Sequence, residues 1–125
     1  MMQSALGILT RRVKNASQYS WQGLRACFRH EEAFRVELAL AAILFPLAFV
    51  FAESMLDLAL LFASVLLVLI VELLNSALEA AVDLESTERS ELAGRAKDMG
   101  SAAVLLSMLV FLLVWGALGW QNLLA

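Results

Sequence analysis

The sequence predicts an all-α membrane protein with three transmembrane helices and an N-terminal amphipathic helix at the membrane surface. Hydrophobic residues make up 62% of the 125 residues, whereas soluble domains are usually about 45–50% apolar. This excess is too large for a soluble core and lies mainly in three long apolar runs. The segment before the first run carries regularly spaced basic side chains instead.

The N-terminal segment, about residues 5–33, has the pattern of an amphipathic helix. Apolar and basic residues recur at roughly helical spacing, with Tyr19 and Trp21 among them. Such a helix lies in the plane of the membrane interface; packing against a soluble partner is the alternative. The apolar members are Ala5, Ile8, Leu9, Val13, Ala16 and Leu24, and the basic ones are Arg11, Arg12, Lys14 and Arg25.

The three apolar runs are each long enough, with some tilt, for a membrane helix. A span needs about 20 predominantly apolar residues, and only helices or closed barrels satisfy backbone polar groups in lipid. Pro46 falls inside the first run, where a membrane helix tolerates it. We expect membrane helices at about residues 36–52, 56–82 and 99–120, in a single domain of residues 1–125.

Lysine and arginine indicate the orientation of these helices. Basic residues precede the first run and occur again after the second, in residues 83–98, but residues 53–57 and the C-terminal end have none. The positive-inside rule therefore places the N-terminus and residues 83–98 in the cytoplasm. The net charge of −3 argues against a nucleic-acid partner, and the single Cys27 cannot form an internal disulfide.

A polar stripe begins at the end of the second run. Glu72, Asn75, Glu79 and Asp83 lie within about 80° of one another on a helix that turns 100° per residue. A solvated helix end would explain Asp83, but it explains Glu72 poorly because Leu73 and Leu74 follow it. Carboxylates at this depth usually mark a functional site.

Two carboxylates and an amide suit Mg²⁺ and the phosphates bound to it, because magnesium needs only one or two protein carboxylates. Phosphoryl transfer also requires cations and a residue that orients or deprotonates the acceptor. Arg12, Arg95 and Lys97 are available as cations. The sequence has no GxxxxGK[ST] and no GxGxxG motif, which argues against a standard nucleotide-binding fold.

Two pairs of motifs give a more specific prediction. The segments "VELLNSALEAAVD" and "ELAGRAKDMGSAAVLL", together with "YSWQGLRA" and "EEAFRVE", resemble the prokaryotic diacylglycerol kinase family over about residues 12–120. The resemblance implies a small homotrimer in the bacterial inner membrane, with a cytoplasmic N-terminus. It also implies transfer of the γ-phosphate of MgATP to diacylglycerol, which yields phosphatidic acid. The expected partners are thus ATP, Mg²⁺, diacylglycerol, membrane lipid and further copies of the chain.

The same resemblance implies roles for individual residues. Glu72 matches the general base, Asn75 the residue that orients the reacting groups, and Glu31 and Glu79 the carboxylates that hold the metal on ATP. The implied nucleotide contacts are Arg12, Tyr19, Glu31, Glu79, Glu88, Arg89, Ser90, Lys97 and Asp98. Ser90 stands where a well-studied branch of the family has His.

The resemblance also implies which residues bind the lipid substrate. This part is less specific, because Trp and Arg near a membrane interface are also ordinary anchors. The residues that match it are Arg12, Ser20, Trp21, Arg25, Glu72, Ser101 and Trp115.

Two other functions are compatible with parts of this pattern. Undecaprenol kinase has the same polar stripe, although "EEAFRVE" and "YSWQGLR" favour the diacylglycerol branch. A non-catalytic or transporter-like small membrane oligomer could use a membrane Glu for proton coupling, but it would not need the "GRAKD" segment.

The orientation can be tested with single cysteines in a Cys27→Ser background. We expect Glu88→Cys to be protected from a membrane-impermeant maleimide in intact cells, and Glu53→Cys to react, because the basic residues hold the first position inside. Labelling of the cysteine at 88 from outside would contradict the topology.

Overall fold

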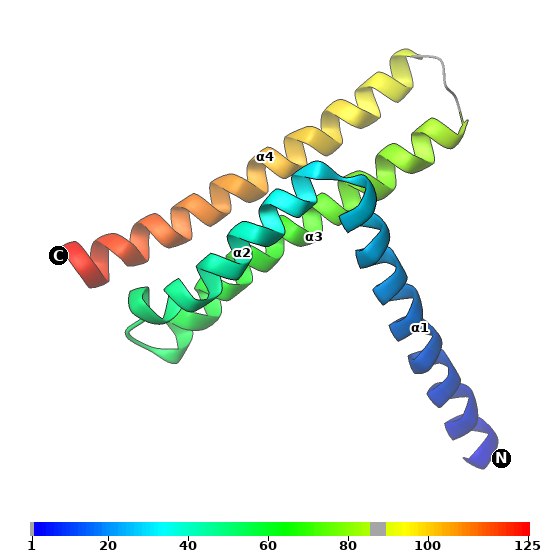
Figure 1. Ribbon diagram of the computed structural model, residues 1–125, viewed down its shortest axis with the longest axis horizontal. Coiled ribbons are helices and arrows are strands. Elements are labelled where there is room, and N and C mark those ends of the chain that lie inside the picture. The colour runs from blue at the N-terminus through cyan, green and yellow to red at the C-terminus, as the bar shows by residue number, and fades with distance from the viewer. Residues whose placement is uncertain (1, 86–89) are drawn as a thin grey trace. The chain divides into compact units, whose positions relative to one another are not determined.

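The computed structural model describes residues 2–85 and 90–125, and the described part is almost entirely helical without strands (Figure 1). Three of its helices are long and apolar enough to cross a membrane, so the predicted all-α membrane fold is confirmed. The helices are α1 (Met2–His30), α2 (Glu32–Phe51), α3 (Met55–Glu85) and α4 (Glu91–Gly119), followed by a short π-helix, η1 (Trp120–Leu124).

Helix α1 and the residues that follow it, up to Glu32, form one compact unit of the chain. The helix ends at His30, and the Glu31 N–H still donates to the carbonyl of Cys27, at 2.8 Å. The hydroxyls of Thr10 and Ser17 donate hydrogen bonds to the carbonyls of the residues four positions earlier in the same helix. Both the apolar and the basic side chains of its pattern are exposed.

The second unit contains α2, α3 and α4, which follow one another in alternating directions (Figure 1). Pro46 lies within α2 without ending it. In the described part of the chain, three aromatic contacts join the helices. Phe45 and Phe49 both meet Phe62 edge to face, with centroids 5.0 and 5.8 Å apart, and Phe51 lies 5.2 Å from Trp115. The buried core consists of Ala41 and Ala48 of α2, Leu61 and Val65 of α3, and Trp115 and Leu118 of α4.

One polar contact crosses this core. The indole N–H of Trp115 donates to Ser64 Oγ at 3.0 Å, and the Ser64 hydroxyl donates to the carbonyl of Leu61 at 2.8 Å. Both side chains are buried, so neither has water as an alternative partner. The contact therefore fixes how α4 is rotated against α3.

A second polar contact ties the C-terminal end to the turn between α2 and α3. Asn122 Nδ2 donates to the Phe51 carbonyl at 2.7 Å and to Asp57 Oδ2 at 2.9 Å. The Asp57 carboxylate also accepts from the Glu53 N–H at 3.1 Å. This turn thus holds α2, α3 and the end of α4 together.

The contact between Ser64 and Trp115 can be tested by a stability measurement. Ser64→Ala leaves the indole N–H buried without a partner, which typically costs about 1–3 kcal/mol. We expect this loss in unfolding experiments on detergent-solubilised protein. Ser107→Ala is the matched control, because Ser107 is also buried but, among the described residues, its hydroxyl bonds to Val104 of its own helix. Equal stability of the two variants would contradict the role of the cross-helix bond.

Candidate functional site

The polar stripe of α3 passes from the packed bundle into solvent. Glu72 is only 5% exposed, Asn75 and Glu79 are half-buried, and the Asp83 side chain is 60% exposed. Glu72 and Glu79 are separated by about 10 Å along the helix axis. One helix face thus carries a buried carboxyl group at Glu72 and further side-chain oxygen atoms that lie closer to solvent.

The structure adds an acidic residue that the sequence analysis missed. Glu37 of α2 shares a side-chain hydrogen bond with Glu72 of α3, and its Oε2 atom is buried without a partner among the described residues. A hydrogen bond between two carboxyl groups requires a proton on one of them, because a carboxylate can only accept. The signal was present in the sequence: Glu37 is an acid between Val36 and Leu38 at one end of an apolar run, much as Glu72 is at the end of another.

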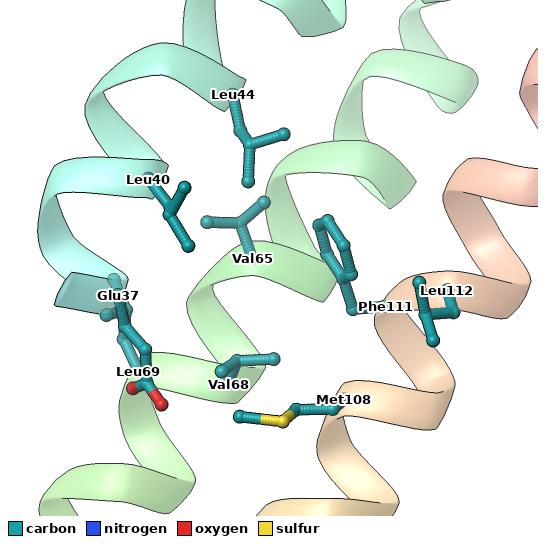
Figure 2. Close-up of a pocket in the computed structure, with 9 residues that line it drawn as sticks. All are labelled: Glu37, Leu40, Leu44, Val65, Val68, Leu69, Met108, Phe111 and Leu112. Atoms are coloured by element: carbon teal, nitrogen blue, oxygen red, sulfur yellow. The ribbon is translucent and has the colours of Figure 1, made fainter. Parts of the chain in front are cut away.

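An apolar pocket of about 270 Å³ begins at Glu37. Figure 2 shows its nine lining side chains, of which Glu37 alone carries a carboxyl group. The other lining residues, from α2, α3 and α4, are Leu40, Leu44, Val65, Val68, Leu69, Met108, Phe111 and Leu112. The pocket therefore places a hydrocarbon-lined volume beside the Glu37 carboxyl group.

Helix α4 brings the "GRAKD" segment alongside the stripe. Lys97 Nζ lies 2.7 Å from Asp83 Oδ1, and Gly100 packs against Asn75. Asp98 and Ser101 are exposed on the same helix. Ser90 caps the helix by accepting a hydrogen bond from the Ala93 N–H at 3.0 Å. A cation and further polar groups thus lie near the exposed end of the stripe.

The other predicted site residues lie elsewhere in the described chain or outside it. Trp115 is buried in the core on Ser64, about 12 Å along the axis of α3 from Glu72. Glu31 is half-buried at the break between α1 and α2, while Glu88 and Arg89 lie outside the described residues. The predicted site residues of α1 are all exposed: Arg12, Tyr19, Ser20, Trp21 and Arg25.

The donor set fits a magnesium ion that is carried by a nucleotide. The described residues contain no group of three or more His, Cys, Asp or Glu side chains that could hold a metal by themselves. A Mg²⁺ ion bound to phosphates needs only one or two protein carboxylates and keeps several waters. Glu79 and the buried Oδ1 atom of Asn75, one turn apart on one helix face, are oxygen donors of the kind this ion prefers.

Comparison with known proteins gives a consistent family assignment. The family model described as prokaryotic diacylglycerol kinase matches residues 18–118. The diacylglycerol kinase of Haemophilus influenzae is 50% identical over 83% of this chain and 88% of its own length. The diacylglycerol kinase of Escherichia coli K12 is 46% identical over 89% of this chain and 91% of its own length. The diacylglycerol kinase of Pseudomonas aeruginosa is 47% identical over 86% of this chain and 88% of its own length. The chain therefore belongs to the prokaryotic diacylglycerol kinase family.

Proposed function

We propose that the protein phosphorylates diacylglycerol at the cytoplasmic boundary of the bacterial inner membrane. The acceptor's hydroxyl oxygen bonds to the γ-phosphorus of ATP, the bond from that phosphorus to the β–γ bridging oxygen breaks, and ADP leaves with phosphatidic acid. The observation that carries this proposal is the buried Glu72 carboxyl at the apolar end of a stripe of oxygen donors. The names of the relatives favour diacylglycerol over undecaprenol, and a kinase over a transporter-like oligomer.

Glu72 acts as the general base that takes the hydroxyl proton. A base must be a carboxylate when the hydroxyl arrives and must lie within hydrogen-bond reach of it. When Glu37 holds the proton of their shared hydrogen bond, Glu72 is the carboxylate. The apolar pocket that begins at Glu37 accepts an acyl chain of the lipid, so the hydroxyl is held beside the base.

The nucleotide binds toward the exposed end of the stripe. Glu79 and Glu31 would hold Mg²⁺, which would supply positive charge to the ATP phosphates, and Asn75 would orient the reacting groups. Lys97 lies here already, in its ion pair with Asp83. The remaining nucleotide contacts are assigned to Arg12, Tyr19, Glu88, Arg89, Ser90 and Asp98. Positioning and charge stabilisation account for most catalysis of phosphoryl transfer.

The membrane and further copies of the chain complete the arrangement. The surface helix, with the N-terminus in the cytoplasm, places Arg12, Ser20, Trp21 and Arg25 at the interface with the lipid. Ser101 of α4 belongs to the same lipid-binding side, whereas Trp115, which the resemblance also implies there, is buried in the core. Large apolar side chains are exposed along α3 and α4, for example Leu66, Ile70, Leu105 and Leu112. Lipid and the neighbouring subunits of a homotrimer of this single-domain chain cover them.

The reaction can be tested directly with purified protein in micelles. We expect label from the γ-phosphate of ATP to appear in phosphatidic acid when diacylglycerol is offered, and far less label in lipid when undecaprenol is offered. Glu72→Gln keeps the size of the side chain but removes the proton acceptor, and general bases contribute about 10²–10⁴-fold. Its kcat should fall by that factor while ATP binding and assembly persist. A folded, ATP-binding variant with near-normal kcat would contradict the role of Glu72.

The pairing of Glu37 with Glu72 predicts different effects for two substitutions. Glu37→Gln retains an N–H donor for the Glu72 carboxylate, whereas Glu37→Leu removes it. A hydrogen bond to a charged group is worth about 1.5–3 kcal/mol, so Glu37→Leu should lower kcat by about 10–100-fold, and Glu37→Gln by clearly less. The KM for ATP should stay the same in both. Glu53→Gln, on the exposed turn after α2, is the control. Equal losses in the two variants would count against the pairing.

The metal assignment predicts a change in magnesium dependence. Glu79→Gln should raise the Mg²⁺ concentration that gives half-maximal activity, because an amide holds the cation more weakly than a carboxylate. Glu91→Gln, exposed in the first turn of α4, should leave it unchanged. Titration of activity with Mg²⁺ at fixed ATP measures the difference, and a normal titration curve for Glu79→Gln would remove this residue from the metal site.

A further inference from the structure

Gly100 of α4 lies at a point where any side chain would displace side chains of α3. A Cβ atom added there would lie 2.9 Å from Leu78 Cδ2 and 3.3 Å from Asn75 Cγ, and it would be closest to Asn75 Oδ1. Carbon atoms in contact are normally about 3.5–4.0 Å apart. The Asn75 carboxamide therefore occupies the space that a side chain at position 100 would need.

The other glycines of α4 do not share this property. A Cβ atom at Gly94 or at Gly116 would meet nothing within 4 Å, and one at Gly119 would meet only the ring of Phe51, at 3.0 Å. Gly100 is thus the one glycine within α4 whose missing side chain makes room for a polar group. This distinguishes a close approach of two helices from a general preference for small residues.

Asn75 also has an unusual environment. Its Oδ1 atom is buried, faces Gly100 and has no hydrogen-bond partner among the described residues. A buried polar atom without a partner is uncommon in a folded protein and needs an explanation. Here the contact with Gly100 keeps the carboxamide on the side of α3 that faces α4, one turn from Glu79 and close to Glu72 on the stripe.

We propose that Gly100 is a positioning residue that holds the Asn75 carboxamide in the orientation needed for phosphoryl transfer. A methyl group at position 100 would push the carboxamide out of this orientation while leaving the backbone of α4 helical, since alanine forms helices better than glycine does. A displacement of about 1 Å in a catalytic site can cost about 10²-fold in rate. The part of this inference that concerns rate rests on the proposed role of Asn75.

The test compares Gly100→Ala with Gly116→Ala, the same change at an open position of the same helix. The first readout is independent of activity. The chain has three asparagines, Asn15, Asn75 and Asn122, so a ¹⁵N-asparagine NMR spectrum in micelles shows three side-chain amide pairs, and Asn75→Ala identifies the pair of interest. We expect Gly100→Ala to shift the Asn75 pair and leave the other two, and Gly116→Ala to leave all three.

The second readout is kinetic. We expect Gly100→Ala to lower kcat by about tenfold or more with little change in the KM for ATP, and Gly116→Ala to leave both unchanged. If Gly100→Ala does not fold, Leu78→Ala/Gly100→Ala is compared with Leu78→Ala, because Leu78 is the aliphatic group in the way of the methyl. An unshifted Asn75 amide pair would overturn the positioning contact. A shifted pair with unchanged kcat would instead overturn the role of Asn75 in the proposed reaction.

Discussion

A polar group among apolar helices is costly unless it has a partner, and this constraint shapes the bundle of α2, α3 and α4. The Trp115 indole is paired with Ser64, the Asn122 amide with Phe51 and Asp57, and the Glu37 carboxyl with Glu72. Each pair joins different segments, so the same contacts that satisfy polar groups also set how the helices are rotated. A few polar contacts between otherwise apolar helices thus help to set how the helices pack.

The exceptions to this pairing are informative. Among the described residues, buried side-chain atoms without a partner are Glu37 Oε2, Asn75 Oδ1 and Asn122 Oδ1. Asn122 uses its amide nitrogen twice at the turn after α2, so its role there is structural. The other two belong to the polar stripe or to its carboxyl partner, which is where we propose that the substrates bind.

Helix α3 can serve two substrates of opposite character because its polar stripe crosses a boundary. At Glu72 the stripe is buried beside the apolar pocket, and at Asp83 it is exposed and paired with Lys97. In the proposed reaction, the lipid hydroxyl binds near the first point and the nucleotide near the second. With both substrates bound in this way, one continuous helix would hold acceptor and donor at a set separation, and positioning is the main requirement of phosphoryl transfer.

The helical fold and the polar stripe were predictable because both depend on local properties of the chain. Hydropathy and length define the membrane helices, and the 100° turn per residue puts Glu72, Asn75 and Glu79 on one face whatever surrounds them. Contacts between helices were not predictable, because they depend on how each helix is rotated and shifted against its neighbour. The contact between Glu37 and Glu72 was therefore not predicted. Trp115, which matched the lipid-binding side in sequence, lies in the core against Ser64. Gly100 was recognisable as a small residue, but only the packing of α4 on α3 shows that its missing side chain makes room for Asn75.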